Sequence, residues 1–147
     1  MTQAAHPYQA TCVEIGGRGL LIQGPPGSGK SSLALSLIDR GARLVGDDSL
    51  LVEAKDGRLL ARPHPSTYGL LEIRNLGLLA FPCAQVASLA LAVVLDPAAP
   101  RYIEEASSLD LCGASIPSLA LCPHDSVLPL KAELALRRFG LSPGLSQ

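Results

Sequence analysis

The amino-acid sequence predicts an α/β fold built on a mixed sheet. Short apolar runs of strand character recur along most of the chain, and only residues 32–40 and 128–139 repeat apolar residues at helical spacing. Several neighbouring runs are joined by hairpin-type turns, which give antiparallel pairs. A strand that leads into a helix favours a parallel neighbour instead. The sheet is therefore expected to contain both kinds of pairing.

Length and composition bound the class of protein. The chain has 147 residues, enough for one domain, expected over residues 1–147 with flexible ends at 1–8 and 142–147. Its formal net charge of -1 and its 3% of aromatic residues argue against a nucleic-acid partner. The four cysteines form no Cys-x-x-Cys pair, which suits reduced thiols in a cytosolic core.

Membrane insertion and secretion are not expected either. The longest apolar run, residues 86–95, contains Ser88 and is too short to cross a bilayer. The first residues lack the basic start and the long apolar stretch of a signal peptide. We therefore expect a soluble, cytoplasmic protein without a membrane partner.

The first half of the chain is expected to form one helix, residues 32–40, with Gly41 as its C-cap. Gly-Gly-Arg-Gly at residues 16–19 is a turn between the first two strands. Lys-Asp-Gly-Arg at residues 55–58 is a strong hairpin turn. The strands of this half are expected at residues 10–15, 19–23, 42–46, 49–54 and 59–62.

The second half begins with a loop at residues 63–69, rich in proline and ending in glycine. The continuous apolar run 88–95 is typical of a fully buried strand, and residues 128–139 of a terminal helix that ends at Gly140. Shorter strands are expected at residues 70–73, 78–81, 109–111, 114–116 and 119–122, the third and fourth of these forming a hairpin.

The clearest chemical signal lies between the second strand and the first helix. Residues 24–31 read Gly-x-x-x-x-Gly-Lys-Ser, the P-loop pattern, in which backbone N–H groups turn into one concavity that suits phosphate oxygens. A helix N-terminus adds only about 0.3–1 kcal/mol where exposed, whereas micromolar nucleotide binding needs roughly 8 kcal/mol. Lys30 on the outer phosphates and a Mg²⁺ held through Ser31 are expected to contribute much of the rest. The alternative is a glycine-rich turn that binds nothing. The expected nucleotide-binding residues are Gly24, Pro25, Pro26, Gly27, Ser28, Gly29, Lys30, Ser31 and Ser32.

Two further segments carry charges beside apolar runs. Asp47 and Asp48 end a short strand, and in phosphoryl transfer one acid can hold Mg²⁺ while another takes the proton of the acceptor hydroxyl. An exposed turn with two solvated acids is the simpler interpretation. Glu72 and Arg74 stand among apolar neighbours, either as a surface salt bridge or as a second Mg²⁺ ligand and a phosphate partner.

These segments together resemble the catalytic domain of HPr kinase/phosphorylase, in a short form without the family's N-terminal domain. The P-loop is followed by Arg-Gly-x-Arg-Leu-Val-x-Asp-Asp, at residues 40–48, and by Leu-Glu-Ile-Arg-x-Leu-Gly, at residues 71–77. Other P-loop kinases share the first motif but not these continuations. The resemblance covers residues 9–139 and implies a single P-loop kinase domain with a mixed sheet, similar to the HPr kinase / PEP carboxykinase-like fold.

The resemblance also implies roles for individual residues. Lys30 would contact the β- and γ-phosphates of ATP, and Ser31 and Glu72 would bind Mg²⁺. Asp48 would be the general base that accepts the proton of a serine hydroxyl on HPr, with Asp47 in the Mg²⁺ shell. The implied function is ATP-dependent phosphorylation of the phosphocarrier HPr, which regulates carbohydrate utilisation through the phosphotransferase system. The family's hexamers imply a homo-oligomer.

The sequence departs from the family's pattern at three places. Gln9 stands where the family usually carries a histidine, and His6 and His64 are expected to be exposed tail and loop residues. The family's catalytic arginine is assigned to Arg101, whose neighbours are not of the family's Asp-Arg-Leu-Gly type. Residues 122–127 replace the family's segment for dephosphorylation, so kinase activity is better supported than phosphorylase activity.

Two other functions are compatible with the motifs. A small-molecule kinase would usually need a lid with several arginines, and only Arg74 and Arg101 are candidates. A catalytically weakened ATP-binding regulator would bind ATP without turnover, even when HPr is added.

Overall fold

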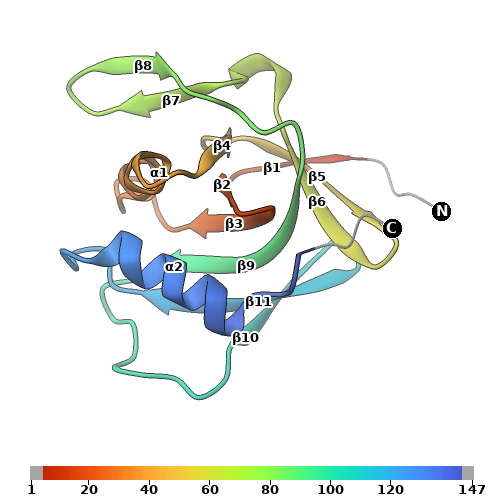
Figure 1. The fold of residues 1–147 in the computed structure, drawn as a ribbon, viewed down its shortest axis with the longest axis vertical. Helices are drawn as coiled ribbons and strands as arrows, with labels where there is room; N and C mark the ends of the chain where they lie inside the picture. Colours follow the sequence, from red (N-terminus) through yellow and green to blue (C-terminus); the bar gives the residue numbers. More distant parts are fainter. Residues whose placement is uncertain (1–4, 144–147) are drawn as a thin grey trace.

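The computed structural model describes residues 5–143 of the chain. The fold is α/β with a mixed sheet, so the predicted fold class is confirmed (Figure 1). In chain order, the elements are β1 (His6–Tyr8), β2 (Thr11–Ile15), β3 (Arg18–Gln23), α1 (Lys30–Asp39), β4 (Arg43–Gly46), β5 (Leu50–Lys55), β6 (Arg58–Pro63), the 3-10 helix η1 (Pro65–Thr67), β7 (Leu70–Ile73), β8 (Gly77–Ala80), β9 (Ala87–Leu95), β10 (Ser107–Leu111), β11 (Ala114–Leu121) and α2 (Leu128–Phe139).

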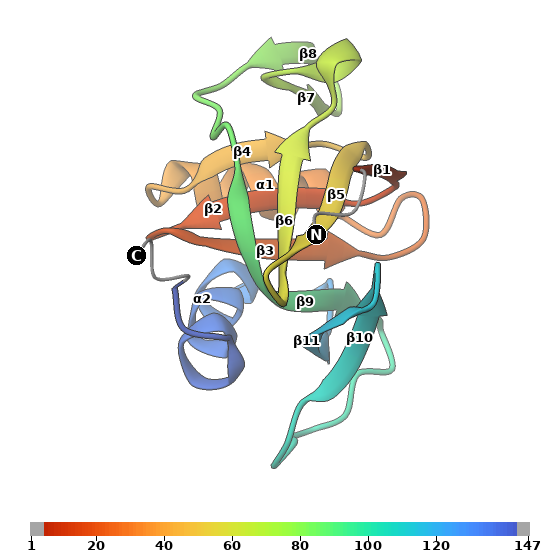
Figure 2. The ribbon, with the colours of Figure 1, turned by 90° about the vertical axis from the view of Figure 1, so that its right-hand side faces the viewer.

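The main sheet has nine strands, seven of which follow the order β1-β5-β6-β9-β3-β2-β4. Strand β9 lies at its centre, as expected for a long apolar run. It pairs with β3 in parallel along one side. On its other side, it pairs with β6 antiparallel at Ala87 and Ser88, and with β11 in parallel from Ala92 to Leu95. The sheet therefore divides beyond β9, with β6 and β5 on one branch and β11 and β10 on the other (Figure 2).

Side chains alternate between two apolar layers, as the pleat of a strand requires. In β3, Leu20 and Ile22 pack with the helices, whereas Leu21 points to the opposite face. The first layer includes Leu33 and Leu37 of α1, together with residues of α2. The second layer is closed by β5 and β6, which cross over that face of the sheet (Figure 2). The helices therefore cover one face, and the curled strands cover the other.

Strands β7 and β8 form a separate antiparallel hairpin beyond the main sheet (Figure 1). Leu71 is fully buried and belongs to the layer that also contains α1. All of β8 is exposed, with Leu78 at 66% of its surface. The hairpin is thus attached through one strand and leaves the other in solvent.

Parts of both segments that were expected to be flexible take part in contacts with the rest of the fold. Residues 1–8 were expected to be flexible, but His6–Tyr8 form β1 and pair with β5. Ser142 was expected in a flexible tail, yet its carbonyl accepts a hydrogen bond of 3.0 Å from Arg58. Residues 1–4 and 144–147, which belong to the same expectation, lie outside the described residues. Pairing of a short strand with β5 is a tertiary contact that composition does not reveal.

Two expected boundaries are also wrong. The predicted strands 114–116 and 119–122 are one strand, β11, which continues through Pro117. Pairing of β11 with β9 begins only at Ser118, so the N–H that Pro117 lacks is not needed on that side. Arg40, rather than Gly41, is the C-cap of α1, and Gly41 follows it with a φ of 110°. Within the described residues, both helices are too short or too polar to cross a membrane.

Candidate functional site

The glycine-rich loop connects β3 to the first turn of α1. Gly29 is the N-cap of α1 and has a φ of 102°, a backbone conformation that residues with a Cβ rarely adopt. A Cβ at Gly24 would lie 2.5 Å from Oγ of Ser28, so the loop closes tightly only around a glycine. The N–H of Ser28 donates to the carbonyl of Pro25 at 3.1 Å, which completes the turn. Backbone conformation therefore requires the glycines that the motif supplies.

Lys30 lies over this loop rather than extending into solvent. Its Nζ donates hydrogen bonds to the carbonyls of Gly24, at 2.9 Å, and of Pro25, at 3.3 Å. The ammonium group is therefore close to the concavity formed by the loop. Oγ of Ser28 is buried and has no hydrogen-bond partner. An unpaired buried hydroxyl is unfavourable, and Ser28 is not among the residues that line the cavity described below.

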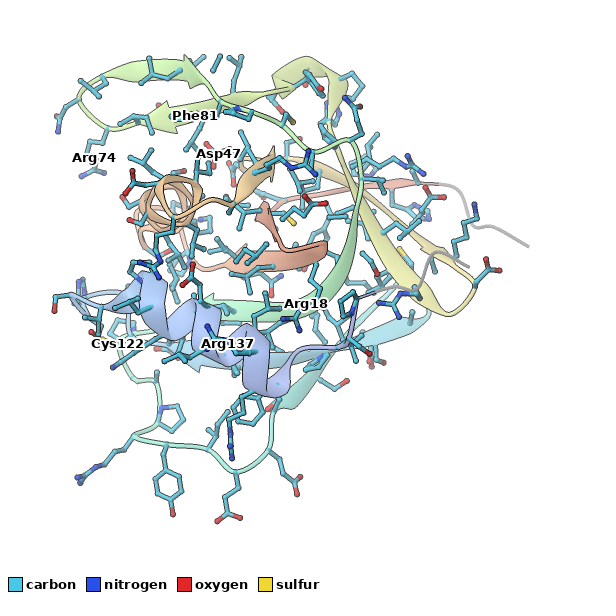
Figure 3. All side chains as sticks on the ribbon, viewed as in Figure 1. Arg18, Asp47, Arg74, Phe81, Cys122 and Arg137 are labelled. Atoms are coloured by element: carbon cyan, nitrogen blue, oxygen red, sulfur yellow. The ribbon has the colours of Figure 1, made fainter. Side chains whose placement is uncertain are left out.

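Asp47 joins four segments of the chain. Its Oδ1 accepts a hydrogen bond of 2.8 Å from the hydroxyl of Ser31 and one of 3.0 Å from the hydroxyl of Thr11. Its Oδ2 accepts the backbone N–H of Glu72 at 3.1 Å. Figure 3 shows Asp47 between β4 and the hairpin above it. The carboxylate thereby links α1, β2 and β7 at the end of β4.

Asp48 has different neighbours from Asp47. Its backbone has a φ of 63°, in the left-handed region, and its N–H donates to the hydroxyl of Thr11 at 3.3 Å. Nε2 of Gln9 lies 3.5 Å from both carboxylate oxygens of Asp48. Gln9, at the position where the resemblance expects a histidine, therefore faces this acid. Asp48 itself is exposed, so its carboxylate is accessible to another molecule.

A cavity of about 990 Å³ brings these groups together. The P-loop and the first turn of α1 line one part of it, and the turn of the β7–β8 hairpin lines another. Arg74 projects from that turn (Figure 3). Within residues 5–143, no salt bridge joins Glu72 to Arg74, and both residues line the cavity. The predicted site residues that line the cavity are Gly24, Pro26, Gly27, Gly29, Lys30, Ser31, Ser32, Asp47, Asp48 and Glu72.

Three predicted residues do not line this cavity. Pro25 and Ser28 belong to the P-loop but are not among the residues that line the open space. Arg101 is exposed in the segment between β9 and β10, and the cavity does not include it. Arg74 is the arginine that the structure brings to the site.

Sequence reasoning missed two polar residues near the site. Gln23, at the end of β3, lines the cavity and donates a hydrogen bond to the hydroxyl of Tyr8. Thr11 contacts both acids, as described above. A threonine inside an apolar strand was the signal available for Thr11, but β-branched residues are so common in strands that it identifies no site.

The residues present fit a nucleotide with Mg²⁺. The loop offers backbone N–H groups in a concavity and the ammonium group of Lys30. Ser31 and Asp47 offer hard oxygen ligands beside it. Among residues 5–143, no group of three or more His, Cys, Asp or Glu side chains could hold a metal alone. Mg²⁺ usually binds one or two carboxylates together with phosphates and water, and Asp47 and Glu72 both line the cavity.

Comparisons with known proteins agree on one family. Residues 2–84, more than half of the chain, match the model of the HPr Serine kinase C-terminal domain. The HPr kinase/phosphorylase of Clostridium beijerinckii is 48% identical over 67 residues, which make up 46% of this chain and 22% of that protein. The HPr kinase/phosphorylase of Streptococcus thermophilus is 52% identical over 68 residues, again 46% of this chain and 22% of that protein. The matched stretch thus spans only about a fifth of these relatives.

A solved structure extends the likeness in fold to nearly the whole chain. The Hpr(Ser) kinase/phosphatase from Coxiella burnetii superposes with a TM-score of 0.79 and covers 90% of this chain and 88% of that one. Sequence identity in this superposition is 24%, so it shows the fold alone. The family model, the relatives and the fold lead to the same conclusion: the chain belongs to the HPr serine kinase C-terminal domain family.

Proposed function

We propose that this chain is an ATP-dependent protein-serine kinase whose acceptor is the phosphocarrier HPr, acting in regulation of carbohydrate utilisation through the phosphotransferase system. The family membership supports the reaction class, and the names of the relatives support the acceptor. The observation that carries the proposal is the hydrogen bond from Ser31 to Asp47. It ties the phosphate-binding loop to the acid pair inside one cavity.

Each group in the cavity has a role in this proposal. Lys30 and the loop N–H groups hold the outer phosphates of ATP, since ammonium and amide groups complement their charge. Ser31, Asp47 and Glu72 are the residues that would hold Mg²⁺. When bound, Mg²⁺ neutralises charge on the transferring phosphoryl group.

Asp48 acts as the general base. Its exposed carboxylate lies in the same cavity as the loop and accepts the proton of the serine hydroxyl as that oxygen attacks the phosphorus. Gln9 faces Asp48 with a neutral amide. The reaction then breaks the bond between the γ-phosphorus and the bridging oxygen, and ADP leaves.

The proposal favours kinase over phosphorylase activity, because residues 122–127 do not resemble the family's dephosphorylation segment. A small-molecule acceptor is less well supported. Among the described residues that line the cavity, Arg74 is the one arginine, and a closed small-molecule site would need more cationic groups around its phosphates.

We also expect the protein to be cytoplasmic and to form a homo-oligomer. The four cysteines are free, which suits a reducing cytoplasm. Self-association would cover some of the exposed apolar side chains, such as Leu76 at 71% and Tyr102 at 76% of their surface. Light scattering of the purified protein would give the number of copies, and a monomer at all concentrations would contradict this part.

Phosphorylation of HPr tests the central statement. The protein is incubated with γ-labelled ATP, Mg²⁺ and HPr, and phosphoserine is measured by mass spectrometry. Parallel reactions contain pre-phosphorylated HPr with inorganic phosphate, to detect the reverse activity. We expect phosphoserine on HPr and little phosphate-dependent reversal. Binding of ATP without any transfer to HPr would contradict the kinase proposal and favour an ATP-binding regulator.

A further inference from the structure

Thr11 is the one buried polar residue among residues 5–143, with none of its surface exposed. It is the first residue of β2 and precedes Cys12 and Val13, which are equally buried. Burying a hydroxyl in an apolar layer is unfavourable unless its hydrogen bonds are made. The question is therefore which groups this hydroxyl satisfies.

The hydroxyl of Thr11 uses both its donor and its acceptor on the acid pair. It donates to Oδ1 of Asp47 at 3.0 Å and accepts the N–H of Asp48 at 3.3 Å. One small group thus holds the side chain of one acid and the backbone of the next. Sheet register explains the contact: Cys12 pairs with Gly46, so Thr11 lies opposite the residues that follow β4.

Both held groups need a fixed position. Asp48 has a left-handed backbone, which is uncommon for a residue other than glycine and depends on neighbouring contacts. Oδ1 of Asp47 receives hydrogen bonds from both Ser31 and Thr11, and Oδ2 receives one from the N–H of Glu72. These three donors approach from different elements and leave the carboxylate a single orientation in the cavity.

We propose that Thr11 is a positioning residue that sets the orientation of Asp47 and the backbone of Asp48. This inference rests on the proposed function, because it matters only if the two acids handle a nucleotide and its metal. Without the hydroxyl, Asp47 keeps Ser31 and Glu72 as partners, but the turn at Asp48 loses its anchor. Thr11 contacts neither phosphate nor acceptor in this proposal and acts through the acids.

Three variants of the full chain separate positioning from simple packing. Thr11→Val keeps the shape of the side chain and removes the hydroxyl, whereas Thr11→Ser keeps the hydroxyl and removes a methyl group. Val13→Ala is the matched control, since Val13 is buried on the same strand, pairs with Leu44 and belongs to the apolar layer. Each variant is first checked by thermal unfolding and circular dichroism.

The principal measurement is ATP binding by titration calorimetry, with Mg²⁺ and with EDTA. Because Thr11→Val loses a hydrogen bond to a charged group, we expect the Mg²⁺-dependent gain in affinity to fall about tenfold. Affinity in EDTA should stay within about twofold of the wild type, since the P-loop is unchanged. Thr11→Ser should retain most of the Mg²⁺-dependent gain in affinity. Val13→Ala should lower the melting temperature but leave that gain unchanged.

The proposal is overturned if Thr11→Val keeps the wild-type Mg²⁺ dependence, or if Thr11→Ser loses as much as Thr11→Val. If Thr11→Val does not fold, Thr11→Ala is judged by the same criteria. A wild type that binds Mg²⁺-ATP but does not phosphorylate HPr contradicts the proposed function alone. In that case the binding data still decide the role of Thr11.

Discussion

The hydroxyl of Ser31 donates a hydrogen bond of 2.8 Å to Oδ1 of Asp47. This contact connects the first turn of α1, which follows the glycine-rich loop, to the turn after β4, where the acid pair lies. Thr11 and the N–H of Glu72 hold the same carboxylate from β2 and β7. Asp47 is therefore held by contacts from α1, β2 and β7. Substitutions in these elements should change how the site binds and reacts.

Replacing Lys30 should weaken nucleotide binding selectively. Lys30→Met removes the ammonium group that lies over the loop carbonyls and keeps the length of the side chain. A charged hydrogen bond to phosphate is worth about 1.5–3 kcal/mol, so the Kd for ATP should rise roughly tenfold to a hundredfold. Titration calorimetry measures it. Lys55→Met, at the exposed end of β5, is the control and should bind as the wild type does.

Asp48→Asn should separate binding from transfer. The variant retains the size of the side chain, and asparagine tolerates the left-handed backbone at this position, but an amide cannot accept the serine proton. We expect a Kd for ATP within about threefold of the wild type and a loss of about a hundredfold or more in kcat for HPr phosphorylation. Asp56→Asn is a matched control, because Asp56 also has a positive φ, of 52°, in a distant hairpin turn. Full activity of Asp48→Asn would remove the assignment of the base.

The β7–β8 hairpin should depend on a single buried leucine. Leu71→Ala removes a fully buried side chain from the layer that contains α1, and such changes typically cost about 2–5 kcal/mol. Leu78→Ala, on the exposed strand of the same hairpin, should change the free energy of unfolding by less than about 0.5 kcal/mol. Urea denaturation measures both.

Leu71→Ala should also weaken the hydrogen bond between the hairpin and Asp47. Leu71 precedes Glu72, whose N–H donates to Asp47. Faster hydrogen exchange at that amide in Leu71→Ala would support this coupling. Unchanged exchange together with lowered global stability would show that the hairpin is held by other contacts.

Alkaline pH should destabilise the protein through Cys12. Burial raises the pKa of this thiol well above its ordinary value of 9.0, and the nearby carboxylate of Glu14 adds to the shift. Below pH 9 the thiol is protonated in both states, so its contribution to stability is fully present. Above pH 9 the unfolded chain releases the proton and the folded chain keeps it, so stability falls as pH rises.

The expected change of the free energy of unfolding with pH follows from the release of one proton. Between pH 9 and 10.5, this thiol should lower the free energy of unfolding by up to about 1.4 kcal/mol per pH unit. In Cys12→Ala that contribution is absent, so the decline should be shallower, even though the variant starts from a lower stability at pH 7. Urea denaturation at a series of pH values gives both slopes. Equal slopes for the two proteins would contradict the assignment to Cys12.

Several features followed from local patterns in the sequence. The spacing of Gly24, Lys30 and Ser31 predicted a strand-to-helix loop, and the turn at Asp56 and Gly57 predicted the hairpin of β5 and β6. The apolar run in β9 predicted a buried strand, and most of its residues are buried. These signals lie within a few residues of one another, so backbone preference and periodicity are enough to reveal them.

Other features depend on contacts between segments far apart in the chain. No local pattern indicated that His6–Tyr8 would pair with β5, or that β11 would run unbroken through Pro117. The resemblance assigned the family's catalytic arginine to Arg101, whereas the cavity is lined by Arg74 and not by Arg101. In each case the deciding interaction is with a neighbour whose position is set by the order of strands in the sheet.

By itself, the sequence determined that a P-loop motif, an acid pair and a glutamate-bearing strand exist, because each is a local pattern. Only the tertiary structure decided that they form one cavity and that Thr11 contacts both acids. The physical reason is the placement of β2 between β3 and β4, which sets Thr11 opposite the turn after Gly46. Strand order is a property of the whole folded chain, and no local periodicity encodes it.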